Sequence, residues 1–363
     1  MQQITTITIN HIRYPLAELQ QLCKEKQSGE TAQWEKDIFA FISIWLDENE
    51  TLQVYTSGST GKPKKIKLRK SWMKYSAGQT CNFFGLNQNS SALLCLPASY
   101  IAGKMMIVRA FVSGLNLITC PPEGNPFHHL TEIVDFAAVT PFQLHQSLAT
   151  LANSPAVKTL IVGGGEISPA LSTQARQLDI NIYATYGMTE TSSHIALKRV
   201  NGQNPERFFR VIGDTQIKRD ERNCLTICNP HLFEGWLVTN DIVSIEDDRH
   251  FRWLGRYDNI INSGGLKISP EEIEQVISHL REDKMIVTSK PHPKLGQALV
   301  LVLENRALTH QEKGLLEKEM KNILPVYHLP KEILALEHFP LTATGKPDRM
   351  KIASLVAKKN AES

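Results

Sequence analysis

The middle of the chain repeats one unit: a short apolar run, then a turn, then an amphipathic segment. Residues 135–139 and 157–162 are apolar runs of strand length, and residues 141–152 and 169–177 have helical spacing. Ser168 is a favourable N-cap for the second helix, and the proline that follows it fits the first helical position. Because strands that alternate with helices pack as layers, the sequence predicts an α/β fold here.

The pattern differs on either side of this region. Near the N-terminus, an alternating strand precedes two helical segments, over residues 15–26 and 32–45. After about residue 207, short strands with turn signals dominate, and a further mixture of helices and strands follows. We therefore expect a large layered α/β domain over residues 1–257 and a smaller α+β domain over residues 258–363.

Composition excludes several classes of protein. The 363 residues are 42% hydrophobic, which is enough to build a core without disulfides or a structural metal. Lys and Arg number 40 against 37 Asp and Glu, and this net charge of +3 indicates no nucleic-acid partner. No apolar run approaches the roughly 20 residues of a membrane span. The first ten residues have no basic flank and no apolar run, so we expect no secretory signal there. The six scattered cysteines are typical of reduced thiols, so we expect a cytoplasmic protein.

One loop has the composition of a phosphate-binding site. A short strand runs into a stretch of hydroxyl and glycine residues followed by lysine. Glycines let backbone N–H groups approach an anion, hydroxyls add donors, and lysine adds positive charge. The glycine spacing differs from that of the ATPase P-loop. The residues of this predicted phosphate loop are Thr56, Ser57, Gly58, Ser59, Thr60, Gly61 and Lys62.

Three later motifs contain groups that suit a nucleotide. In the loop after a predicted strand, Tyr186 offers a ring that can stack on a base, and Thr189 offers a hydroxyl for a phosphate. Glu190 can hold Mg²⁺ against phosphate oxygens. Asp241 ends a strand and is suited to accept from two ribose hydroxyls, and Lys346 lies in a glycine-containing loop near the C-terminus.

In the same order along the chain, these stretches resemble the conserved motifs of the adenylate-forming superfamily. That superfamily includes acyl- and aryl-CoA synthetases, peptide-synthetase adenylation domains and luciferases. The resemblance runs from about residue 54 to residue 349. It implies the adenylate-forming fold, with a large N-terminal domain and a small mobile C-terminal domain.

The resemblance also implies roles for the residues of the nucleotide site. The phosphate loop would bind pyrophosphate, Thr189 would contact the α-phosphate, and Glu190 would bind the Mg²⁺ ion. Lys346 would be the lysine of the adenylation step. The residues expected around adenine and ribose are Gly163, Gly164, Gly165, Tyr186, Gly187, Asp241 and Arg256.

The same resemblance implies a second half-reaction, in which CoA takes the acyl group. Asp258 would be the hinge of the C-terminal domain, and Gly264, Gly265 and Lys267 would line the CoA tunnel. The implied substrates are ATP, CoA and a small carboxylic acid, with Mg²⁺ as cofactor. We expect no membrane insertion, and a homodimer stays open.

The sequence departs from the common pattern of the superfamily at three points. Only about 50 residues precede the phosphate loop, which implies an abridged N-terminal region. Tyr100 stands where many members have His, within an acyl-pocket motif that also contains Gly103. Asn240 replaces the usual Gly before Asp241, and we expect little effect from this change.

Within the superfamily, the small size and the acid-pocket residues most resemble the o-succinylbenzoate–CoA ligases of menaquinone biosynthesis. That acid has a second carboxylate, which needs a cationic partner. Arg109 is our candidate, with Lys104 behind it, and the alternative is that either residue caps a helix or lies in solvent. His194 has two interpretations, as a residue lining the acid pocket or as a surface histidine.

Other functions remain open at this point. The chain is predicted to be an acid–thiol ligase, either for o-succinylbenzoate or for another aryl or acyl acid. A stand-alone adenylation enzyme that loads a carrier protein would share the same motifs. A nucleotide sensor without catalysis is disfavoured because Lys346, Glu190 and Asp241 are all present.

Overall fold

The computed structural model describes residues 6–55, 65–154, 156–281, 283–305, 307–342 and 346–361. Its helices are α1 (Leu16–Ser28), α2 (Gln33–Leu46), α3 (Lys70–Phe84), α4 (Ile101–Ser113), α5 (Pro141–Asn153), α6 (Pro169–Ala175), α7 (Pro270–Ile277), α8 (His310–Ile323) and α9 (Arg349–Ala361), and its short 3₁₀ helices are η1 (Pro126–His129), η2 (Thr189–Thr191), η3 (Tyr257–Asn259) and η4 (Val326–His328).

The strands of the N-terminal part are β1 (Thr6–Ile9), β2 (Ile12–Pro15), β3 (Thr51–Tyr55), β4 (Lys65–Arg69), β5 (Ser91–Leu94), β6 (Asn116–Thr119), β7 (Val134–Val139), β8 (Val157–Val162), β9 (Asn181–Gly187), β10 (His194–Arg199), β11 (Phe209–Val211), β12 (Gln216–Arg219), β13 (Cys224–Cys228), β14 (Trp236–Ile245) and β15 (His250–Arg256). Those of the C-terminal part are β16 (Ile261–Ser263), β17 (Leu266–Ile268), β18 (Met285–His292), β19 (Gly296–Glu304) and β20 (Glu332–Leu336).

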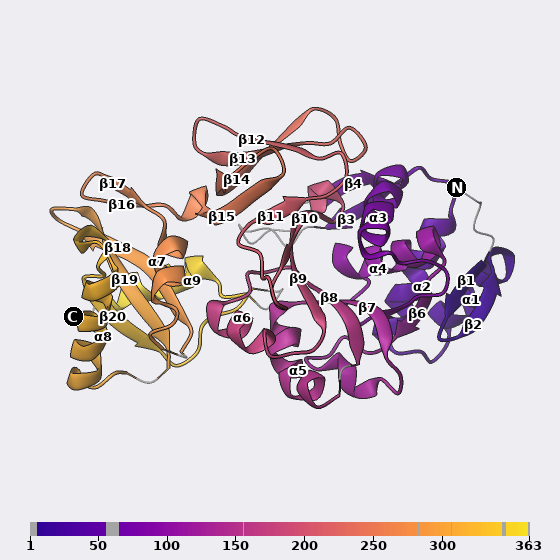
Figure 1. Cartoon of the computed structure of the whole chain (residues 1–363), viewed down its shortest axis with the longest axis horizontal. Coiled ribbons are helices and arrows are strands. Elements are labelled where there is room, and N and C mark those ends of the chain that lie inside the picture. Colours follow the sequence, from indigo (N-terminus) through magenta and orange to yellow (C-terminus); the bar gives the residue numbers. More distant parts are fainter. Residues whose placement is uncertain are drawn as a thin grey trace.

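One large sheet runs through the N-terminal part, in the order β12-β13-β14-β15-β11-β10-β9-β8-β7-β5-β6-β1-β2. The strands from β9 to β1 in this order pair in parallel, whereas β10 to β15 form an antiparallel extension. Helices cover both faces of the parallel part, and the antiparallel part projects from it (Figure 1). The predicted α/β fold is therefore confirmed.

The alternation of side chains along the parallel strands places them in two cores. Phe136 and Ala138 point into the cluster with α2, α3 and α4, whereas Ala137 and Val139 point into the cluster with α5 and α6. This period of two follows from the strand geometry, and burial on both faces explains why these runs read as continuously apolar.

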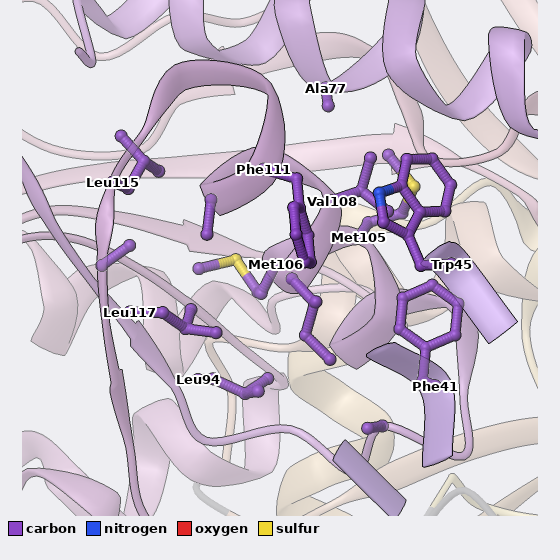
Figure 2. Close-up of a cluster of buried hydrophobic side chains, with 14 of the residues drawn as sticks. Phe41, Trp45, Ala77, Leu94, Met105, Met106, Val108, Phe111, Leu115 and Leu117 are labelled. Carbon is purple, nitrogen blue, oxygen red and sulfur yellow. The ribbon is translucent and has the colours of Figure 1, made fainter. Parts of the chain in front are cut away.

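The N-terminal helices complete the first of these cores. Phe41 and Trp45 on α2 pack against α4, where the ring centroids of Trp45 and Phe111 lie 6.5 Å apart. Figure 2 shows these rings beside Met105 and Val108 of α4. Since α4 also contains Arg109, this packing fixes the helix that carries a predicted substrate residue.

The C-terminal part forms a separate sheet, in which β19 pairs with β16, β18 and β20. Its strands also alternate between two cores: Val287 and Leu301 face α7 and α8, whereas Ile286 and Val302 face α9. Figure 1 shows this lobe beside the larger one. A boundary at residue 257 stays a prediction.

Two elements differ from the sequence expectation. The sequence pattern indicates a helix over residues 105–112, but α4 begins at Ile101. Gly103 weakens the helical pattern, yet it is required there, because a Cβ atom would lie 2.3 Å from the carbonyl oxygen of Pro97. The pattern also gives no indication of α9, whose described side chains contribute only Ile352 and Val356 to the core.

The described cysteines are all free, as expected. None of the helices within the described ranges has the length and apolar character needed to cross a lipid bilayer.

Candidate functional site

The carboxyl ends of β8 and β9 lie next to each other and carry two predicted motifs. Parallel strands direct these ends to one edge of the sheet, where ligands of open α/β sheets bind. The glycine turn, Gly163 to Gly165, follows β8 directly. A Cβ atom at Gly163 would lie 2.3 Å from Oγ1 of Thr185 in β9, so only glycine allows this close approach. The predicted phosphate loop, residues 56–64, lies outside the described residues.

The loop after β9 is held rigidly by its own side chains. The Thr191 hydroxyl accepts from the N–H of Met188 at 3.0 Å and is buried. Ser192 adopts a positive φ of 63°, which is unusual for a residue other than glycine. Thr189 and Glu190 form the turn of η2 at the surface of this loop, where both are half-buried.

Glu190 fits the role of a magnesium ligand. No side chain in the described ranges pairs with its carboxylate, although the residue is half-buried. Carboxylate oxygens suit Mg²⁺, and the ion would supply positive charge to phosphate oxygens.

Asp241 is a buried carboxylate that receives three donors. The Tyr186 hydroxyl donates to it at 2.6 Å, the Trp253 indole at 3.2 Å, and the Arg256 guanidinium at 3.3 Å. Burial, followed by the charge of Asp241, raises the pKa of Tyr186 well above its ordinary value. The phenol is therefore a neutral donor, and Tyr186, Asp241 and Arg256 lie together as the sequence predicts.

Lys346 reaches this group from the C-terminal lobe. Its Cε atom lies 3.7 Å from the position that a Cβ atom would take at Gly165. The surrounding protein lowers the pKa of Lys346, first through loss of hydration and then through the charge of Arg256, while Asp241 opposes the shift. The lysine thus lies beside both the glycine turn and the Asp241–Arg256 pair.

The predicted hinge residue contacts the same group. Asp258 accepts from Arg256 at 2.8 Å and from the Asn240 amide at 3.0 Å. Arg222 in turn donates to the Asn240 side chain at 3.0 Å. Asn240, from which we expected little effect, therefore links the predicted ribose site to the hinge segment.

The predicted CoA residues do not join this cluster. Gly264 and Gly265 have positive φ values of 59° and 85° and form the two-residue turn between β16 and β17. Lys267 on β17 is exposed. Figure 1 places this hairpin on the outer side of the C-terminal lobe, away from the glycine turn.

Arg109 is a buried cation without a counter-ion. It is 1% exposed, and among the described residues no carboxylate lies within ion-pair distance. Nη2 donates to the Ser193 hydroxyl at 2.9 Å, whereas Nε has no partner. Burial lowers the pKa of Arg109 to about 10, so the group stays charged at neutral pH. The interpretation of Arg109 as a helix cap or solvent-exposed residue is wrong.

Other acid-pocket residues have different surroundings. His194 is 6% exposed, so its interpretation as a surface histidine is wrong. Lys104 donates to the carbonyl oxygens of Ala98 and Ser99, the latter at 2.8 Å, and so supports the loop before α4. Tyr100 is 41% exposed at the start of α4.

Sequence reasoning missed Trp253, Ser193 and Thr80, which contact Asp241, Arg109 and His194 respectively. Only the position of Ser193 beside the Tyr186–Thr191 motif gave a signal. Thr80 lies 114 positions from His194, and Trp253 belongs to no motif that the sequence analysis identified.

The chain also matches a known family of enzymes. The model of the AMP-binding enzyme family matches residues 12–218, which is more than half of the chain. The chain belongs to this family.

Curated relatives extend the comparison beyond the matched region. The chain is 28% identical over 342 residues to a 2-succinylbenzoate–CoA ligase of Listeria monocytogenes, covering 86% of this chain and 72% of the relative. It is 27% identical over 346 residues to a 2-succinylbenzoate–CoA ligase of Bacillus cytotoxicus, covering 84% and 70% respectively.

Solved structures resemble this fold. An acyl-CoA synthetase (AMP-forming)/AMP-acid ligase II-like protein from Dyadobacter fermentans is 33% identical, with a TM-score of 0.59 over 93% of this chain and 98% of that one. The o-succinylbenzoate CoA synthetase of Bacillus subtilis, solved with the acyl-adenylate OSB-AMP, is 21% identical and has a TM-score of 0.70, covering 83% and 68%. This second likeness shows the shared fold.

Gly187 offers a test of the rigid loop after β9. A Cβ atom there would lie 2.3 Å from the backbone carbonyl oxygen of Ser193. We expect Gly187→Ala to lower stability by about 1–3 kcal/mol, because the backbone must move, and to lower ATP-dependent activity. Gly314→Ala is the control, since Gly314 lies on α8 with open space around it and its replacement should stabilise slightly. Thermal unfolding and activity assays measure both variants; a wild-type melting temperature for Gly187→Ala would contradict the prediction.

Proposed function

We propose that the chain is an ATP-dependent acid–CoA ligase that works through an acyl-adenylate, with o-succinylbenzoate as its acid. Membership of the AMP-binding enzyme family and the names of the curated relatives support the reaction type. The observation that carries the substrate class is Arg109, a buried guanidinium without a carboxylate partner in the described ranges. Burying an unpaired charge is costly. An anionic group of the substrate would pair with the Arg109 guanidinium and offset this cost.

The proposed reaction has two steps. A carboxylate oxygen of the acid attacks the α-phosphorus of ATP, and the bond to the β-phosphate bridging oxygen breaks to release pyrophosphate. The CoA thiol then loses its proton and attacks the acyl carbon, and AMP leaves. The first step brings two anions together, so groups of positive charge at the phosphates lower its barrier.

Three of the described residues would bind the nucleotide or stabilise the reacting phosphate. Asp241 would accept from the ribose hydroxyls, and Tyr186 would hold the base with its ring while its hydroxyl keeps Asp241 oriented. Lys346 would bring its ammonium to the reacting phosphate, since it lies beside the glycine turn. The pKa of Lys346 is lowered because the ammonium group has lost part of its hydration. In such surroundings, the ammonium charge interacts more strongly with a phosphate than it would in water.

The C-terminal lobe would change its placement for the second step. In the described arrangement, Gln275 of α7 donates to Glu166 at 2.9 Å, and Lys346 lies at the nucleotide side. The predicted CoA residues are remote from that side. We therefore propose that residues 258–363 rotate about Asp258, which would bring the β16–β17 hairpin to the site.

A second candidate function is adenylation followed by transfer to a carrier protein instead of free CoA. It would use the same nucleotide-site residues and differ in the thiol that accepts the acyl group. ATP and CoA are cytoplasmic metabolites, so the proposed activity belongs in the cytoplasm. Light scattering in solution tests whether the chain forms a homodimer.

Pyrophosphate exchange over a panel of acids tests the proposed function. We expect exchange with o-succinylbenzoate and thioester formation when free CoA is added. Arg109→Met keeps most of the side-chain volume and removes the charge. It should raise the KM for o-succinylbenzoate by about tenfold or more, but leave the KM for 4-oxo-4-phenylbutanoate, which lacks the ring carboxylate, unchanged. Equal changes for both acids would remove Arg109 from the substrate site, and exchange without thioester formation would favour the carrier-protein alternative.

The role of Lys346 is tested by separating the two steps. Lys346→Ala should slow adenylate formation by about 10²–10³-fold, which is the effect of losing one preorganised donor to the transition state. Thioester formation from preformed o-succinylbenzoyl-AMP should remain close to wild type. Lys351→Ala is the matched control, because this exposed lysine of α9 pairs only with Asp348 among the described residues. An equal loss in both steps for Lys346→Ala would contradict the assignment.

A further inference from the structure

A continuous line of polar side chains connects α4 to α3 through β10. Arg109 Nη2 donates to the Ser193 hydroxyl at 2.9 Å, and that hydroxyl lies 3.4 Å from Nδ1 of His194. His194 Nε2 lies 3.2 Å from the Thr80 hydroxyl. The Thr80 hydroxyl donates to the carbonyl oxygen of Ser76 at 3.1 Å. All but Ser193, which is half-buried, are buried.

The direction of each hydrogen bond follows from its two ends. The Ser76 carbonyl can only accept, so the Thr80 proton is used there and the Thr80 oxygen accepts from Nε2–H of His194. A neutral imidazole carries one N–H, so Nδ1 accepts from the Ser193 hydroxyl. The Ser193 oxygen then accepts from Arg109, so each N–H or O–H donor in the line has an acceptor.

His194 is neutral in this arrangement. Burial and the nearby charge of Arg109 both lower its pKa, to well below the ordinary value of histidine. The line of side chains therefore holds the guanidinium through one N–H and adds no negative charge to it. Among the described residues, Nε of Arg109 has no partner, and Nη1 donates to the weak acceptor Sδ of Met106 at 3.3 Å.

We infer that Ser193, His194 and Thr80 are positioning residues that orient Arg109 while leaving its charge and its other N–H groups for a carboxylate of the substrate. A carboxylate side chain in place of this neutral line would also orient the guanidinium, but it would neutralise it. The line thus selects for a dicarboxylic acid. This inference rests on the proposed function and concerns the carboxylate that is not adenylated.

Thr80 allows the line to be cut without touching the substrate site. Thr80→Val removes the hydroxyl at nearly constant volume, and Thr80→Ser keeps it. We expect Thr80→Val to raise the KM for o-succinylbenzoate by about three- to tenfold, the effect of one buried hydrogen bond. The kcat for this acid and the KM for 4-oxo-4-phenylbutanoate should stay at wild-type values, and Thr80→Ser should restore the wild-type KM.

The outcomes distinguish a failure of this inference from a failure of the proposed function. If the wild-type chain exchanges pyrophosphate with o-succinylbenzoate but Thr80→Val has an unchanged KM, the inference fails and the proposed function stands. A KM that rises equally for both acids assigns Thr80 to general packing, which also overturns the inference. If the wild-type chain accepts only the monocarboxylate, the proposed function fails and the inference fails with it.

A separate cluster lies in the connection between β6 and β7. Glu123, His128 and His129 are exposed, and Nε2 of the two histidines lies 3.7 Å and 3.4 Å from Oε2 of Glu123. The centroids of the two imidazole rings lie 3.9 Å apart, and the ring planes are tilted by 37°. Ligands held about 2.0–2.1 Å from one tetrahedral ion are separated by about 3.4 Å, so these contacts match a shared metal.

A backbone contact of His128 also suits a metal ligand. Its Nδ1 faces the carbonyl oxygen of Asn125, which can only accept, so Nδ1 donates there and Nε2 is the ring nitrogen directed at Glu123. An N–H donated to a backbone carbonyl is the usual support of a metal-bound histidine. We propose that the three residues bind a divalent transition metal of the zinc class.

Binding of Zn²⁺ alone, measured by equilibrium dialysis of the full chain in excess Mg²⁺, tests this site. We expect the wild-type chain to retain one Zn²⁺, and His129→Ala to weaken its binding by about tenfold or more. His145→Ala, an exposed histidine on the neighbouring α5, should bind as the wild type does. Absence of bound Zn²⁺ in the wild-type chain, or equal binding in His129→Ala, would overturn the proposal.

Discussion

The carboxylate of Asp241 on β14 is bound by side chains from two other strands, β9 and β15. A buried carboxylate is stable only where donors surround it. Tyr186 lies near the end of β9 in the parallel sheet, and Trp253 lies on β15 of the antiparallel extension. Arg256 is the last residue of β15, directly before the hinge segment. Because all three donate to one side chain, the parallel sheet, its extension and the hinge segment are fixed relative to one another. Asp241 therefore determines the shape of the surface on which the nucleotide would lie.

The two cations of the candidate site are placed at a cost in stability. Arg109 is buried, and Lys346 is partly dehydrated beside Arg256. Neither forms an ion pair within the described ranges. The protein stabilises other partly buried charges differently, since the Arg349 guanidinium pairs with Glu274 between α9 and α7. Uncompensated cations at one site and paired charges elsewhere are typical of a site shaped for anionic ligands.

Much of the fold was predictable because its signals are local. Ser168 accepts from the N–H of Leu171 at 3.2 Å, as the predicted cap requires. Strand β8 has the bounds of its apolar run over residues 157–162. In contrast, α9 follows from the presence of the C-terminal sheet, which buries a stripe of only two described apolar residues. Such a narrow stripe gives little signal until the surface that covers it exists.

The sequence by itself determined which chemical groups stand at the turns: the glycines after β8, the Tyr186–Glu190 loop, and Asp241 at its strand. These depend on a few neighbouring residues, and local backbone geometry limits the choice of residue. Only the tertiary structure decided that Arg109 is buried with no counter-ion among the described residues, and that His194 contacts Thr80, which is 114 positions away. Burial and hydrogen-bond partners depend on the order of strands in the sheet and on the helices that cover it. The periodicity of one segment contains no information about either.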